Sequence, residues 1–113
     1  ILELEFDANL KANNMEKCFQ ISEKLLEYFP KYYKSYEKKG ILFYSLGDFN
    51  YSKSIFEKSI SLNKFAANSN YYLGVLAFEK LDNNLGEYYF KIALEGGDIE
   101  KEIRIEIINK LKN

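Results

Sequence analysis

Few residues of this chain have side chains that commonly carry out chemistry. Cys18 is the only cysteine, and the sequence contains no histidine. A lone cysteine excludes an intramolecular disulfide and any multi-cysteine metal site. Histidine is the commonest general base and a frequent metal ligand, so its absence removes the usual centre of acid–base and metal chemistry. Cys18 is therefore the candidate nucleophile, and a redox or catalytic function of its thiol stays open as an alternative.

Acidic residues form two pairs that could begin a metal site. Glu3 and Asp7, and likewise Glu102 and Glu106, are four residues apart, which puts each pair on one face of a helix. No third ligand stands near either pair, so we interpret them as solvated carboxylates. Glycine-rich phosphate loops, paired-cysteine motifs and nucleophile elbows are also absent from the sequence. We therefore expect no enzymatic activity, no metal and no cofactor.

Composition narrows the classes of partner. Sixteen Lys and Arg against seventeen Asp and Glu give a net charge of −1, whereas nucleic-acid binding needs an excess of cations. No apolar run is long enough to span a bilayer, so we expect neither nucleic-acid binding nor membrane insertion. The chain begins at Ile1 and shows no signal-peptide pattern, so the cytoplasm and a bacterial envelope both stay open as its location.

Helical periodicity runs through the whole chain, which we interpret as one domain, residues 1–113. Short polar breaks separate the periodic segments, and the Asn and Asp residues at these breaks can cap the following helix. The pattern predicts an all-α fold with helices at about 2–12, 14–28, 31–46, 48–61, 65–80, 82–95 and 98–112. Residues 2–6 alternate in polarity, so a frayed or extended start is the alternative there.

The segments repeat at a fixed period. Gly40 recurs as Gly74, and Phe56 recurs as Phe90, with the same separation in both pairs. A period of about 34 residues is typical of stacked helical repeats, in which each unit buries its apolar face against its neighbours.

These residues resemble the tetratricopeptide repeat family. The family pattern of small and aromatic places is met in the second repeat by Tyr36, Gly40, Phe43, Ser52 and Phe56, and in the third by Leu73, Gly74, Ala77, Gly86, Phe90 and Ala93. The first repeat departs from it, with Phe6 at a glycine place and Ser22 at a phenylalanine place. Cys18 stands at the small place of Ser52 and Gly86, which favours a buried, inert thiol.

The resemblance implies a right-handed α-solenoid of about three helix-turn-helix repeats, near residues 1–30, 31–64 and 65–97. A capping helix, residues 98–113, would cover the apolar face of the last hairpin. The alternative for this segment is the first helix of a fourth repeat.

The resemblance also implies a binding surface, because in this family the first helix of each hairpin lines a concave groove that holds a protein or peptide. The matching places are Lys34, Glu37, Lys38, Ile41, Tyr44, Ser45, Asn68, Tyr71, Tyr72, Val75, Phe78 and Glu79, with Glu3 and Asp7 from the first repeat. Tyr44 and Phe78 could equally be core residues. The carboxylate clamp of one family branch is absent, since Glu37, Ile41 and Tyr72 occupy its places.

The alternative function is structural, as a self-associating segment of a larger repeat assembly. Exposed apolar side chains at Ile1, Leu2 and Leu4, or at Ile105, would favour that alternative over a peptide-binding module.

Overall fold

The computed structural model describes residues 1–113 and consists of seven helices without a strand. They are α1 (Leu2–Lys11), α2 (Met15–Tyr28), α3 (Tyr33–Ser45), α4 (Phe49–Leu62), α5 (Ala67–Glu79), α6 (Asn83–Glu95) and α7 (Lys101–Lys112). The all-α prediction is confirmed, and the alternative of an extended start is wrong because α1 begins at Leu2. No helix combines the length and apolar character needed to cross a membrane.

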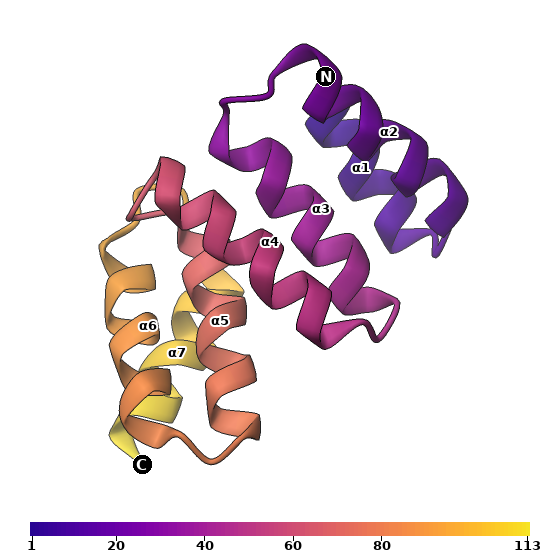
Figure 1. The fold of residues 1–113 in the computed structure, drawn as a ribbon. Coiled ribbons are helices and arrows are strands. Elements are labelled where there is room, and N and C mark those ends of the chain that lie inside the picture. The colour runs from indigo at the N-terminus through magenta and orange to yellow at the C-terminus, as the bar shows by residue number, and fades with distance from the viewer.

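Three hairpins, α1–α2, α3–α4 and α5–α6, follow one another through a molecule of 38 × 25 × 25 Å, and α7 lies behind α5 and α6 in Figure 1. Their turns are built alike. The backbone is left-handed at three places, each one repeat period from the next, which are Asn13, Gly47 and Leu81. The next residue in each turn caps the second helix by accepting a backbone N–H, and these caps are Asn14, Asp48 and Asp82.

Glycine lets the two helices of a hairpin approach closely. A Cβ added at Gly40 would lie 2.6 Å from the ring of Phe56, and one at Gly74 would lie closer still to the ring of Phe90. Both distances are below any real carbon–carbon contact, so each ring packs directly on the glycine backbone. Gly40 and Gly74 therefore lie where the two helices of their hairpins approach closely.

The apolar interior divides into two clusters. The larger joins α1 to α5 and includes Phe6, Ile21 and Leu42, while the smaller joins α5, α6 and α7 around Phe90 and Ile107. Helix α5 belongs to both clusters, so it connects the two halves of the molecule.

Cys18 is fully buried in the larger cluster, as its small-residue place predicts. Burial, and then the nearby charge of Asp7, raises the pKa of its thiol. A thiol held in its protonated form is a poor nucleophile, so the structure gives Cys18 a packing function.

Candidate functional site

Two adjoining hollows form a groove along the first helices of the hairpins. Their volumes are about 290 and 250 Å³, and they share Asp7, Lys38, Asn68 and Glu100 as lining residues. We call their joint lining the groove: Ile1, Glu3, Leu4, Asp7, Leu10, Lys11, Lys34, Glu37, Lys38, Ile41, Asn68, Tyr72, Asp98, Glu100 and Ile103. It draws on α1, α3, α5 and the beginning of α7.

Ion pairs hold α1 against α3 on the groove side. The Lys38 ammonium lies 2.7 Å from an Asp7 carboxylate oxygen and is 8% exposed as a residue. One turn away, the Lys34 ammonium lies 3.9 Å from Glu3 and 3.8 Å from Asp98. The Glu3–Lys34 and Asp7–Lys38 pairs span the same number of residues along the chain. The two ion pairs therefore join equivalent places on the first helices of neighbouring hairpins.

Glu37 continues this relation from α3 to α5. Its carboxylate accepts hydrogen bonds from Asn68 Nδ2 at 3.3 Å, from the Ser69 backbone N–H at 3.0 Å and from the Ser69 hydroxyl at 2.8 Å. Glu37 and Asn68 are separated along the chain by the same number of residues as the two ion pairs. Glu37 is 1% exposed, and this burial raises its pKa, whereas the hydrogen bonds from Ser69 and Asn68 oppose the rise. Glu37 is therefore a structural link between hairpins as well as part of the groove floor.

Charge in the groove is unbalanced. Its acidic members are Glu3, Asp7, Glu37, Asp98 and Glu100, and its basic members are Lys11, Lys34 and Lys38. Five carboxylates against three ammonium groups leave an excess of two negative charges.

The tyrosines of the groove prediction occupy different surroundings. Tyr72 lines the groove, and its ring stacks on Phe56 with centroids 5.1 Å apart and meets Tyr44 at 4.9 Å. Burial, followed by the charge of neighbouring groups, raises the pKa of Tyr72 to about 12. Tyr44 packs edge-on against Phe49 as well and lies beside the groove lining.

Helix α7 contacts part of the remaining predicted surface on α5. The Tyr71 hydroxyl donates a hydrogen bond to Glu106, and its ring stacks on Phe90. The Lys110 ammonium lies 4.6 Å from the centre of the Phe78 ring. The remaining predicted places, Val75 and Glu79, line a separate hollow of about 200 Å³ beside Phe78, Phe90, Glu106 and Lys110. The structure thus brings Lys34, Glu37, Lys38, Ile41, Asn68 and Tyr72 together and assigns Tyr71, Val75 and Phe78 to the packing of α7.

Sequence reasoning missed the contribution of the segment before α7 and the start of that helix. Asp98, Glu100 and Ile103 line the groove, although the sequence analysis, which interpreted this segment as a cap or as the first helix of a fourth repeat, placed no groove residue here. The period accounts only for the position of the helix, because α7 begins at Lys101, one repeat period after the start of α5 at Ala67. Extending the period once more places Glu102, Ile105 and Glu106 at the groove places of Asn68, Tyr71 and Tyr72, so it would not have found the residues that line the groove.

Three of the four carboxylates in the acidic pairs have protein partners. Asp7 binds Lys38, Glu3 lies near Lys34, and Glu106 accepts from Tyr71. Nowhere do three His, Cys, Asp or Glu side chains gather closely enough to hold a metal ion.

Comparison of the chain with protein-family models finds no match. Comparison with curated proteins finds no match either. Function is therefore inferred from the geometry and the charge of the groove.

Proposed function

We propose that this chain is a protein-binding module of the tetratricopeptide type, which holds a peptide or protein segment in the groove and catalyses no reaction. The proposed architecture is a right-handed solenoid of three repeats closed by α7. The recurrence of helix starts at 15, 49 and 83, and at 33, 67 and 101, supports this architecture.

One observation carries the proposed function: both hollows share Asp7, Lys38, Asn68 and Glu100, so the groove is continuous. Its walls combine charged groups with apolar surface from Leu10, Ile41 and Ile103, which is the mixture that peptide recognition uses. Ion pairs and the Glu37 hydrogen bonds hold the groove walls in place before a partner binds. This preorganisation lowers the entropic cost of binding.

Selection of binders from a random peptide display library, followed by titration of the best peptide, tests this proposal. The groove variant is Lys11→Glu with Glu100→Arg, since both side chains are exposed and line the groove. The matched control is Lys24→Glu with Glu23→Arg on the exposed face of α2. We expect the groove variant to bind about tenfold more weakly and the control to bind as the parent does. Equal binding by the groove variant would exclude the groove as the binding surface.

We propose self-association as a second candidate function, because apolar surface is exposed at the α1 end. Leu4 is 74% exposed and Ile1 93% exposed, whereas Leu2 packs against the core. A neighbouring hollow of about 450 Å³ is lined by Leu25, Tyr28, Phe29 and Tyr32 among others. At the other end of the molecule Ile105 is 49% exposed. Contiguous apolar surface of this kind marks interaction sites.

Sedimentation velocity over a wide range of concentration distinguishes this candidate. If the α1 end mediates association, the parent sediments faster as its concentration rises, and Leu4→Lys abolishes the change. Leu81→Lys is the matched control, since Leu81 is 84% exposed on a turn far along the chain. A parent that stays monomeric throughout excludes self-association and leaves peptide binding in the groove untouched.

A further inference from the structure

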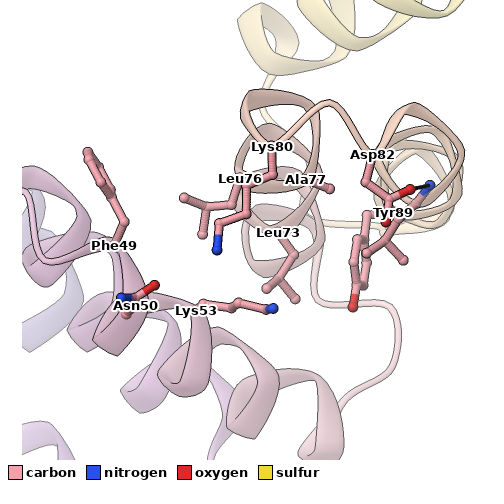
Figure 2. Close-up of a pocket in the computed structure, with 10 residues that line it drawn as sticks. Phe49, Asn50, Lys53, Leu73, Leu76, Ala77, Lys80, Asp82 and Tyr89 are labelled. Atoms are coloured by element: carbon pink, nitrogen blue, oxygen red, sulfur yellow. Dashed lines mark hydrogen bonds between the residues drawn. The ribbon is translucent and has the colours of Figure 1, made fainter.

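A further hollow, of about 250 Å³, opens between the second and third hairpins (Figure 2). Leu73, Leu76 and Ala77 of α5 form its buried apolar floor. Phe49 of α4 and Leu85 of α6, which are 44% and 36% exposed, stand at its edge. We call this hollow the junction cleft.

The junction cleft is separate from the groove. On α5 its lining residues are 73, 76 and 77, whereas the groove uses 68 and 72. At 100° per residue these two sets point to different sides of the helix. One helix thus presents two unrelated surfaces.

The repeat period shows why the cleft is open at this junction. In the preceding hairpin Phe43 and Tyr51 pack edge to face with centroids 4.7 Å apart. Their counterparts in the third hairpin are Ala77 and Leu85. Replacement of two aromatic rings by an alanine and a leucine removes the side chains that would fill this space, so the cleft is a property of this sequence and not of the repeated architecture.

Two lysines at the cleft correspond to apolar side chains one repeat period earlier. Phe19 corresponds to Lys53, and Leu46 corresponds to Lys80. Figure 2 shows both lysine side chains extending into the space between α4 and α5. None of the ion pairs in the structure includes either lysine. The one carboxylate of the lining, Asp82, is committed to capping α6, where it accepts from the Leu85 N–H at 3.2 Å. The cleft therefore presents two ammonium groups that lack an anionic partner beside an apolar floor.

We propose that the junction cleft binds an acidic peptide segment of a partner protein. One large apolar side chain of the segment enters the cleft, and neighbouring carboxylates pair with Lys53 and Lys80. Charge complementarity selects the acidic character of the segment. The volume of the junction cleft suits one peptide side chain and not a whole small molecule, because small-molecule ligands occupy pockets of about 300–1,000 Å³. This site goes beyond the groove function and stands or falls independently of it.

Titration of the ¹⁵N-labelled protein with blocked hexapeptides tests the proposal. The probe peptide has Leu and Phe at its centre and Asp or Glu at the other four positions. Two matched peptides carry Lys at those four positions, or Ser in place of the Leu and Phe. We expect the acidic apolar peptide alone to shift the amide signals of Leu73, Leu76, Ala77 and Leu85.

Two variants locate the contact. Ala77→Phe restores the ring of the preceding hairpin and should weaken binding about tenfold or more by filling the cleft. Lys53→Gln with Lys80→Gln, which changes only exposed side chains, should weaken binding about threefold to tenfold at low salt. Lys17→Gln with Lys24→Gln on α2 is the matched control and should bind as the parent does.

The lysine variant keeps the test decisive if Ala77→Phe unfolds the protein. Lack of shifts with the acidic peptide, equal binding of the basic peptide, or full binding by the lysine variant would each overturn the proposal. Shifts confined to Lys38, Asn68 and Glu100 would overturn it as well and would instead favour the groove.

Discussion

Leu81 is the least favourable residue of the three hairpin turns. Its φ is 63°, at the place where the other turns have Asn13 and Gly47. Left-handed backbone costs an ordinary L-residue about 1–2 kcal/mol, because its Cβ crowds the carbonyl oxygen that follows. Leu81 is 84% exposed, so its side chain gives little packing in return.

Leu81→Asn should therefore stabilise the protein, since asparagine tolerates this conformation. We expect the free energy of unfolding, measured by urea denaturation, to rise by about 0.5–1 kcal/mol. The converse change, Gly47→Leu, meets no atom within 4 Å and should destabilise by about 1–2 kcal/mol through backbone strain alone. Loss of stability in Leu81→Asn would contradict this account of the turn.

Gly74 is constrained by space and not by its dihedral angles. A side chain there would meet the Phe90 ring and, at 3.2 Å, the Gly86 carbonyl oxygen. Gly74→Leu should destabilise by about 1–3 kcal/mol or more through overpacking. Gly97 has nothing within 4 Å of its added Cβ, so Gly97→Ala should leave the thermal midpoint nearly unchanged. Equal midpoints for Gly74→Leu and the parent would show that the hairpin can relax around the new side chain.

Glu37 makes stability depend on pH. Burial raises its folded pKa above the ordinary value of 4.5, so the folded state binds this proton more tightly than the unfolded state does. Its contribution to stability is therefore fully present below about pH 4.5 and is lost as pH rises through the folded pKa.

Glu37→Gln removes this titration. We expect the parent to lose more unfolding free energy than the variant between pH 4 and neutrality, because only the parent must ionise a buried carboxyl. Urea denaturation of both proteins across this range measures the difference directly. Parallel pH profiles would mean that the Ser69 and Asn68 donors fully compensate for burial.

At the scale of elements, the sequence predicts the starts of the helices after α1 best where a side chain caps the helix. The starts of α2, α4 and α6 were each placed within one residue, because Asn14, Asp48 and Asp82 mark them. The residues before α3, α5 and α7 make no side-chain cap. Asp98 resembled a cap, but its carboxylate instead accepts from the Tyr33 hydroxyl at 2.9 Å. A contact between two such distant parts of the chain leaves no local pattern to read.

The candidate site was predictable only where it depends on the repeated helices. The resemblance to the tetratricopeptide repeat family implied that Lys34, Glu37, Lys38 and Asn68 share one surface, because repeated helices present equivalent places. It did not predict the cover over Tyr71, since that depends on the path of α7 and on the contact of Tyr71 with Glu106.

Ile107 is the one buried side chain of helix α7, and it packs against the last hairpin. Ile107 is 0% exposed and packs with Phe90 and Ala93. Ile107→Ala should lower the free energy of unfolding by about 2–5 kcal/mol. Ile105, on the same helix and 49% exposed, is the matched control, and Ile105→Ala should change stability little. If both changes had the same small effect, α7 would be a detachable segment.

At the scale of the whole molecule, the two apolar clusters predict two units of local stability. Hairpins in a stack contact chiefly their neighbours, so stability is a sum of units and interfaces, and a change spreads only as far as the contacts couple it. Here Leu73 joins α5 to the larger cluster, while Tyr71 and Val75 join it to the smaller one. Helices α1 and α2 share no cluster with α7.

Hydrogen exchange of backbone amides tests this division. We expect Ile107→Ala to speed exchange in α6 and α7 strongly and in α5 less, because α5 keeps its contact with the larger cluster through Leu73. Protection in α1 and α2 should stay at the parent level under conditions that favour the folded state. Uniform loss of protection across all seven helices would instead mean that the chain unfolds as a single cooperative unit. In that case α5 would transmit the whole cost of the Ile107 cavity to the N-terminal hairpin, and the groove walls formed by α1 and α3 would weaken with it.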